Sequence, residues 1–297
     1  MKQRIAYIEK MVQRGGPTQR DYEELEAWFR ETMADHWRAV LTLDDIHTLW
    51  TAFGEAFTPK TMQGFVVRKP HGYHGDWEII DRIYTHWTSP DPNLRNWDYF
   101  FHSLHATKAV RNRLSQLHCR LVDLESRRNG EPIEALVVGC GPARDVRVFL
   151  ERNPNTRAKF TCFDHDPSAI DYARNLCASW PTSVHFHVGN VVRHLPRSQF
   201  DLVWAVGLFD YFSDQLFTLM TRRLYDRLKP EGTLIIGNFS KRNPTRAYME
   251  FGGWMIFHRS EEEMMSLSQY AGIHPDQCSI TTESERVNMF LEIRKDR

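Results

Sequence analysis

The sequence predicts an α/β protein in which a doubly wound sheet follows a helical N-terminal region. Short apolar runs alternate with helical patterns after Pro132, as expected of parallel strands joined by crossover helices. The first of these runs ends in a glycine-rich turn at residues 139–141. Before Gly130, apolar residues recur instead at helical spacing. We therefore expect a helical cap or substrate lid over residues 1–130 and a sheet domain over residues 131–297.

Helical periodicity runs through the N-terminal region. Apolar positions separated by three or four residues form two series, namely Tyr22, Leu25, Phe29 and Met33, and then Ala106, Val110, Leu114, Leu117 and Leu121. Such spacing places an apolar stripe along a helix, so both series predict amphipathic helices. The run Phe65-Val66-Val67 is the one segment of this region with strand character, because aromatic and β-branched residues favour strands.

Seven segments after residue 131 have strand character. They are residues 135–138, 159–163, 184–188, 200–206, 233–236, 277–282 and 286–293. The first is a continuous apolar run, which is typical of a strand buried on both faces of a parallel sheet, and the last two are expected to form a closing pair. Asp166-Pro167, Ser213 and Ser260 are expected to cap helices. In such a sheet, ligands bind at the carboxyl ends of the strands, near the point where the strand order reverses.

Composition argues against several classes of protein. The 297 residues include 38 basic and 38 acidic side chains, and this zero net charge favours neither a nucleic-acid partner nor a polybasic membrane binder. No apolar run approaches the roughly 18 residues of a membrane span, and residues 1–16 lack the apolar core of a secretory signal. The five cysteines are scattered without a CxxC pair, so neither a metal site nor a disulfide framework is expected. We expect a soluble, cytoplasmic protein with no stable membrane insertion.

A cofactor site is expected where the first strand meets the following helix. Gly139-Cys140-Gly141 allows a sharp turn and a close approach of a ligand to the backbone. Asp164 ends the second strand, where a carboxylate can accept from both hydroxyls of a ribose. Arg144 stands where the dinucleotide fingerprint requires a small residue, and no Gly-Lys-Ser/Thr triplet follows. A nucleoside cofactor without a pyrophosphate, namely S-adenosylmethionine, fits these residues best.

The third strand ends in Gly189-Asn190, which is expected to lie beside the adenine of that cofactor. The side chain of Asn190 can accept from the exocyclic amine, and Val191 can donate its backbone amide. His165 follows Asp164 and is expected to border adenine or solvent. Ordinary turn positions are the alternative interpretation of Asp164 and Asn190.

The alternation of elements, the segment VVGCGP at residues 137–142 and the segment LKPEGTLII at residues 228–236 resemble class I methyltransferases. The resemblance covers residues 131–297 and implies a Rossmann-like, doubly wound, seven-stranded methyltransferase sheet that binds S-adenosylmethionine. Val137-Val138 stands where this family usually has an acid before the first glycine. This departure leaves open how the amino group of the cofactor is held.

A narrower resemblance is carried by residues 72–78, 109–113, 207–211, and 237–240 with 243–250. These stretches are similar to bacterial methyltransferases of the 3-hydroxypalmitic acid methyl ester synthase type. The resemblance implies carboxyl O-methylation of a 3-hydroxy fatty acid-like small molecule to a methyl ester. An N- or O-methyltransferase of another small molecule in a specialised-metabolite pathway is the first alternative. A non-catalytic, cofactor-binding regulatory domain is the second.

The same stretches supply further candidate site residues. Tyr73 lies in a glycine-framed turn that is expected to fold over the cofactor as part of a lid. Arg113, or Arg111 beside it, is expected to pair with the cofactor carboxylate. Cofactor contacts are also expected of Val206 and Gly207, and catalytic roles of Tyr73, Asp210, Tyr211, Asn238 and Arg246. Plain turn, core or surface positions are the alternative for each of these residues.

The chemistry of methyl transfer bears on the acceptor. The reaction is an in-line displacement, so the protein must chiefly hold the nucleophile in line with the leaving sulfur. A carboxylate is already nucleophilic at pH 7, whereas a hydroxyl needs a base within about 2.6–3.2 Å. No histidine lies cleanly at a strand end beside the acceptor region, and His258 is a weak candidate, so a carboxylate acceptor is favoured. Residues 1–60 are expected to form part of the cap or the interface of a homodimer.

Overall fold

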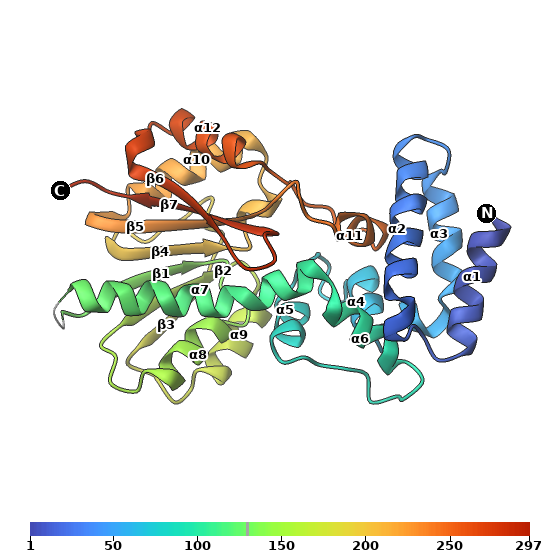
Figure 1. The fold of residues 1–297 in the computed structure, drawn as a ribbon. Coiled ribbons are helices and arrows are strands. Elements are labelled where there is room, and N and C mark those ends of the chain that lie inside the picture. The colour runs from blue at the N-terminus through green and yellow to red at the C-terminus, as the bar shows by residue number, and fades with distance from the viewer. Residues whose placement is uncertain (129–130) are drawn as a thin grey trace. The chain divides into compact units, whose positions relative to one another are not determined.

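A computed structural model describes residues 1–128 and 131–297, which form two compact units (Figure 1). The first unit contains residues 1–110 and 244–255, and the second contains residues 111–243 and 256–297. The division falls inside helix α7 (His105–Arg127) and not near Gly130, which lies outside the described residues. Leu104, just before this helix, packs in the core of the first unit, whereas Leu117 and Leu121 pack against the sheet of the second.

The second unit is built on a sheet of seven strands in the order β3-β2-β1-β4-β5-β7-β6. The strands are β1 (Glu134–Val138), β2 (Lys159–Asp164), β3 (Val184–Val188), β4 (Phe200–Val206), β5 (Leu228–Phe239), β6 (Cys278–Thr282) and β7 (Asn288–Arg294). The first five are parallel, and β7 runs antiparallel to both β5 and β6. The predicted doubly wound sheet with a closing strand pair is confirmed, and its order reverses between β1 and β4.

Helices cover both faces of this sheet (Figure 1). They are the second part of α7, α8 (Arg144–Arg152), α9 (Pro167–Leu176), α10 (Asp214–Tyr225) and α12 (Glu261–Tyr270). Successive side chains of a strand point to opposite faces. Accordingly, Leu136 and Val138 pack in the cluster that contains α10 and α12, whereas Ala135 and Val137 pack in the cluster that contains α7, α8 and α9. Burial on both faces explains the continuous apolar run of β1.

The predicted helix caps are confirmed. Asp166 accepts from the backbone N–H of Ser168, and Pro167 occupies the first helical position of α9. Ser213 accepts from Leu216 N–H at the start of α10. Ser260 forms a capping box with Glu263 at the start of α12. Each cap satisfies a backbone donor that the helix itself leaves without a partner.

The first unit is helical, as expected. It contains α1 (Lys2–Gln13), α2 (Tyr22–Trp37), α3 (Leu43–Ala52), α4 (Met62–Arg68), α5 (Trp77–Tyr84), α6 (Arg95–Ser103) and α11 (Arg246–Phe251). Its core is rich in aromatic rings, and Phe53 stacks on Phe57 with ring centroids 3.9 Å apart. Phe251 of α11 packs edge-on against Phe29 of α2, which explains why residues 244–255 belong to this unit.

The strand character of Phe65-Val66-Val67 is misleading, because these residues lie in α4. All three are buried, so tertiary packing overrides their intrinsic preference for strands. Thr61 caps the helix by accepting from Gly64 N–H. Gly64 is required there, since a Cβ atom at this position would lie 2.0 Å from the carbonyl oxygen of Thr58.

Strand β5 is longer than predicted. It begins at Leu228 and includes Lys229-Pro230-Glu231-Gly232, whereas the predicted strand covers residues 233–236. Its pairing with β4 shifts register between Phe200 and Leu202, so the added residues join the sheet through an irregularity.

Three further features concern the described residues as a whole. None of their helices combines the length and the apolar character needed to cross a membrane. The five cysteines are all free thiols. No group of three or more His, Cys, Asp or Glu side chains in the described part of the chain is arranged to hold a metal ion.

Candidate functional site

The loop after β1 is the centre of the candidate site. Gly139 and Gly141 have φ angles of +65° and +51°, in the left-handed region that favours glycine. A Cβ atom at Gly139 would lie 3.3 Å from Cβ of Leu208, which follows β4. The N–H of Cys140 donates to the carbonyl of Phe163 at 3.0 Å, so the loop is tied to the end of β2. The backbone is thus held tightly between three strand ends, as the glycine pattern predicts.

Asp164 joins the ends of β1, β2 and β3. Its side chain is 8% exposed, and one carboxylate oxygen accepts from Gly141 N–H at 2.8 Å. The other accepts from Asp166 N–H at 3.0 Å and lies 3.2 Å from Nδ1 of His165. A hydrogen bond to this carboxylate raises the pKa of His165. Because each carboxylate oxygen can accept twice, one acceptor position remains, on the oxygen that binds Gly141 N–H, and the predicted contact with both ribose hydroxyls stays a prediction.

The residues after β3 form a compact turn. Gly189 N–H donates to the carbonyl of Asp164 at 2.8 Å. The side-chain oxygen of Asn190 accepts from Val192 N–H at 2.9 Å, which is the geometry of an Asx turn. Val191 is buried in the core, whereas Asn190 is exposed. The amide of Asn190 is therefore held in place, and its contact with adenine stays a prediction.

A buried ion pair lies beyond the end of β4. One oxygen of Asp210 accepts from Phe239 N–H at 2.7 Å, and the other lies 3.6 Å from Nη2 of Arg113. Burial raises the pKa of Asp210 to about 6, although Arg113 and Arg259 oppose the shift. The desolvation of this carboxylate therefore outweighs the attraction of its two basic neighbours.

Arg113 projects from α7 toward the end of β4. Its side chain is 7% exposed, and its Nη2 donates to the side-chain oxygen of Asn288 at 3.3 Å. Gly207 has a φ angle of +106°, and a Cβ atom there would lie 2.8 Å from Nη1 of Arg113. The buried Nε of Arg113 has no hydrogen-bond partner among the described residues. This arginine thus has a buried donor available for an anionic ligand.

Asn238 and Arg259 form a hydrogen-bonded pair at the carboxyl end of β5, where the methyl acceptor is expected. Asn238 is fully buried, and its side-chain amide donates to the carbonyls of Phe239 and Phe257 at 3.0 and 2.8 Å. Its side-chain oxygen accepts from Nη1 of Arg259 at 2.7 Å. Arg259 also donates to the carbonyl of Phe212 at 2.6 Å. Both polar groups of Asn238 thus have protein partners, and its predicted catalytic role stays a prediction.

Two predicted residues, Tyr73 and Arg246, belong to the first unit. Tyr73 lies in a turn between Gly72 and Gly75, both at positive φ, and is partly exposed. Nε of Arg246 donates to a carboxylate oxygen of Glu250 at 2.6 Å. Their catalytic roles stay predictions.

The second unit brings the other predicted residues to the carboxyl ends of its parallel strands. These are Arg113, Gly139, Cys140, Gly141, Asp164, His165, Gly189, Asn190, Val191, Val206, Gly207, Asp210, Tyr211 and Asn238. Val206 ends β4 opposite Gly237 of β5, where a Cβ atom would lie 2.6 Å from Cγ1 of Val206. Tyr211 is 38% exposed and follows the buried Asp210.

The sequence reasoning missed two residues of this region. Arg259 donates to the carbonyls of two residues about 50 positions earlier, and no local pattern marks it. Asp145 accepts from Nε1 of Trp204 at 3.2 Å, across 59 positions of sequence. Its position directly after the glycine loop was the available signal, but an acid in the first turn of a helix is common.

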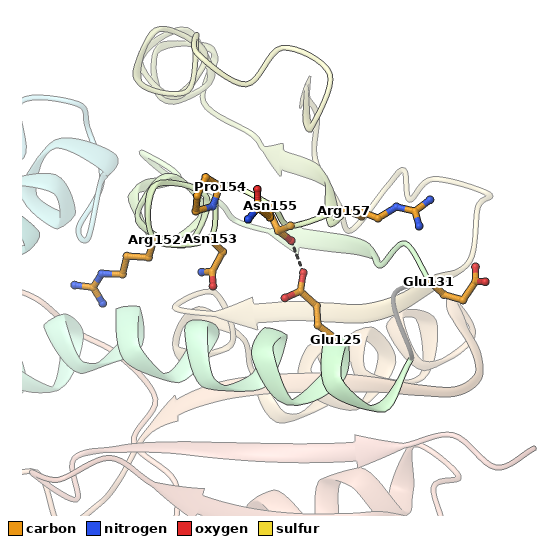
Figure 2. Close-up of a pocket in the computed structure, with 8 residues that line it drawn as sticks. Glu125, Glu131, Arg152, Asn153, Pro154, Asn155 and Arg157 are labelled. Carbon is orange, nitrogen blue, oxygen red and sulfur yellow. Dashed lines mark hydrogen bonds between the residues drawn. The ribbon is translucent and has the colours of Figure 1, made fainter.

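A separate hollow of about 430 Å³ lies at the opposite edge of the sheet (Figure 2). Glu125, Glu131 and residues 152–157 line it, and Thr156 donates to Glu125. Arg152 and Arg157 point away from one another in Figure 2. Because β1 and β2 begin beside these residues, the hollow lies at the amino ends of the strands and contains none of the predicted site residues.

Comparisons with known proteins support a methyltransferase domain in this chain. Residues 135–232 match the family model of a methyltransferase domain. A malonyl-[acyl-carrier protein] O-methyltransferase of Acetivibrio thermocellus is 26% identical over 147 residues, which are 50% of this chain and 46% of that protein. The tRNA(Thr) (cytosine(32)-N(3))-methyltransferase of Saccharomyces cerevisiae is 19% identical over 58% of this chain and 31% of its own length. The chain thus spans less than half the length of these relatives.

Solved structures share the fold. A possible exported protein from Bordetella parapertussis matches with a TM-score of 0.62 and 18% identity, over 75% of this chain and 80% of that one. A putative O-methyltransferase from Nostoc punctiforme matches with a TM-score of 0.52 and 15% identity, over 81% and 71% of the two chains. At these identities, the similarity concerns the fold alone.

Proposed function

We propose that this chain, whose second unit is a class I S-adenosylmethionine-dependent methyltransferase domain, methylates the carboxylate of a small molecule that resembles a 3-hydroxy fatty acid. The domain rests on the family match at residues 135–232 and on the seven-stranded sheet. The acceptor is the proposal. A cytoplasmic location and a homodimer stay predictions.

The cofactor is S-adenosylmethionine, and the residues at the strand ends fit it. The glycines at positions 139 and 141 bring backbone close to the site, and Asp164 offers a carboxylate at the end of β2 for the ribose. The buried Nε of Arg113 has no hydrogen-bond partner in the part of the chain that the structure describes, which suits the carboxylate of the cofactor. When bound, S-adenosylmethionine supplies a methyl group on a positively charged sulfur.

The proposal of a carboxylate acceptor rests on the hydrogen bonds of two buried titratable groups, Asp210 and His258. Asp210 accepts from Phe239 N–H, and Nε2 of His258 lies 3.1 Å from the side-chain amide nitrogen of Asn243. An amide nitrogen only donates, so Nε2 of His258 is the acceptor of that bond. Nε2 of His258 and one oxygen of Asp210 thus accept from protein groups, and the other oxygen of Asp210 lies 3.6 Å from Nη2 of Arg113. These contacts do not favour removal of a proton from a hydroxyl by either group. An acceptor that is already ionised at pH 7, such as a carboxylate, needs no such base.

The named relatives support this choice of acceptor in part. The protein from Acetivibrio thermocellus is named for O-methylation of a malonyl group, and a malonyl group bears a carboxylate. The yeast protein is named for methylation at a nitrogen, which keeps an N-methyltransferase of another small molecule as the second candidate.

Transfer of a labelled methyl group tests the proposal. The protein is incubated with methyl-labelled S-adenosylmethionine and free 3-hydroxy fatty acids, and the product is treated with mild base. Release of the label as methanol supports a methyl ester. Label that is transferred but stable to base supports N- or ether O-methylation and contradicts the carboxylate acceptor.

A matched variant controls for the cofactor site. Asp164→Asn removes a charge beside the glycine loop and keeps an acceptor oxygen for only one of the two backbone donors, Gly141 N–H and Asp166 N–H, so we expect some loss of stability. We expect this variant to fold and to lose most of the transfer activity, because the ribose contact is weakened. Cofactor binding without transfer to any tested acceptor would favour the non-catalytic alternative.

A further inference from the structure

Asp145 lies near the end of β1, where Val137-Val138 replaces the acid that is usual in class I methyltransferases. It stands in the first turn of α8, and its Oδ1 accepts from Val146 N–H at 2.9 Å. Its Oδ2 accepts from Nε1 of Trp204 at 3.2 Å. Trp204 on β4 is the direct register partner of Val137 on β1, the position at which related domains usually have an acid. The carboxylate of Asp145 thus contacts β4 at the residue that pairs with Val137 of β1.

The groups around Asp145 balance its negative charge only in part. The groups that donate to its carboxylate, backbone amides and an indole, are all neutral. Loss of hydration raises the pKa of Asp145 to about 6, and the more distant Arg113 opposes this shift without cancelling it. The residue is nevertheless partly exposed. A cationic group that arrived at this carboxylate would therefore gain an ion pair with a partly desolvated partner.

Arg113, unlike Asp145, is a cation with a hydrogen-bond donor that is unpaired among the described residues. Its guanidinium is buried, its Nε has no hydrogen-bond partner within residues 1–128 and 131–297, and an oxygen of Asp210 lies 3.6 Å from its Nη2. A carboxylate with only neutral hydrogen-bond donors and a guanidinium with one unpaired N–H among the described residues thus lie within electrostatic range of one another. An α-amino-acid group carries both of the missing partners, an ammonium and a carboxylate.

We propose that Asp145 binds the α-ammonium group of the cofactor's amino-acid portion and replaces the acid that β1 lacks, while Arg113 binds the α-carboxylate. The inference rests on the methyltransferase assignment and on no particular acceptor. A purely structural role for Asp145, as an acid that favours the first turn of α8 and anchors Trp204, would not distinguish among ligands that differ only in this ammonium group.

Calorimetry with three ligands separates these roles. S-adenosylhomocysteine has the complete amino-acid group, its deamino analogue lacks only the ammonium, and 5′-methylthioadenosine lacks the whole amino-acid portion. The wild type should bind S-adenosylhomocysteine about 10- to 100-fold more tightly than the deamino analogue, as expected for one charge-assisted hydrogen bond. This measurement needs no variant, so it tests the proposal even where a substitution impairs folding.

The variant Asp145→Asn completes a cycle between protein and ligand. It should bind S-adenosylhomocysteine and the deamino analogue with nearly equal affinity, and it should bind 5′-methylthioadenosine as the wild type does. Glu151→Gln, at the exposed end of the same helix, should leave all three affinities unchanged. Asp164→Asn should weaken the binding of all three ligands, because each contains the ribose.

Two results would overturn the inference. The first is a wild type that does not discriminate against the deamino analogue. The second is an Asp145→Asn variant that weakens all three ligands equally, as a structural role requires. Failure of the proposed acceptor is a separate outcome: the wild type would bind S-adenosylhomocysteine with the expected discrimination but would not methylate any 3-hydroxy fatty acid.

Discussion

Replacing Asp210 by asparagine should make the protein more stable at pH 8 while it impairs methyl transfer. The side chain of Asp210 is 4% exposed, and burial raises its pKa from 3.8 to about 6. A shift of roughly 2 units corresponds to about 3 kcal/mol by which ionisation of Asp210 opposes folding. Asparagine can keep the hydrogen bond from Phe239 N–H without the charge. Its amide group would face Arg113, so we expect a net gain of about 1–2 kcal/mol in the free energy of unfolding.

The pH dependence of this gain is fixed by the direction of the pKa shift. Because the folded state binds the proton of Asp210 more tightly than the unfolded state, wild-type stability from this group falls as pH rises from about 4 to about 6. Above pH 6 the group is ionised in both states, and its contribution is constant. The stability difference between Asp210→Asn and the wild type should therefore be small at pH 4 and complete at pH 7 and above.

Urea denaturation followed by tryptophan fluorescence at pH 4.5 and pH 8 measures this difference. Asp214→Asn is the matched control, since Asp214 also pairs with Arg259 but its side chain is 73% exposed. We expect the control to change stability by less than about 0.5 kcal/mol at either pH. A destabilised Asp210→Asn variant at pH 8, or a stability difference independent of pH, would refute the reasoning.

Two further predictions concern the hydrogen bonds of Asp98 and the close packing of Gly207 against Arg113. Asp98→Asn should destabilise the protein by about 1–3 kcal/mol in the same assay, because both carboxylate oxygens accept backbone N–H groups and an amide can replace only one acceptor. An unchanged or increased stability would contradict this. Gly207→Ala should lower stability by about 1 kcal/mol or more and should weaken S-adenosylhomocysteine binding in calorimetry, since its Cβ atom would lie 2.8 Å from Nη1 of Arg113 at a positive φ. Gly189→Ala is its control for stability, because the nearest atoms to that Cβ lie 3.9 Å away; equal effects of the two variants would refute the argument.

The strands and helix caps could be predicted because their signals are local. Four residues of apolar run mark β1, and a single Asp-Pro pair marks the start of α9. The misassigned segment at residues 65–67 shows the limit of such signals. Its helix depends on the contact of Gly64 with the backbone of Thr58, which no local preference reveals. The membership of residues 244–255 in the first unit likewise depends on long-range aromatic packing.

In the candidate site too, some residues have a local sequence signal and others depend on contacts between distant parts of the chain. The glycines and Asp164 could be found because a strand, a turn and a terminal acid are adjacent in sequence. The partners of Asp145 and Arg259 could not, because Trp204 lies 59 positions from Asp145 and Phe209 lies 50 positions from Arg259. Such contacts depend on the order of strands in the sheet, which places β1 beside β4 only after folding.

A raised carboxyl pKa does not by itself mark a ligand site in this protein, because Asp98, Asp145 and Asp210 share it. Hydrogen bonding separates Asp210 from the other two. Asp98 accepts a backbone N–H on each oxygen, and Asp145 accepts a backbone N–H on one oxygen and an indole N–H on the other. One oxygen of Asp210 accepts a backbone N–H, whereas the other lies 3.6 Å from Nη2 of Arg113. Because an asparagine side chain can replace one acceptor oxygen but not two, we expect loss of charge to stabilise the fold at Asp210 and to destabilise it at Asp98.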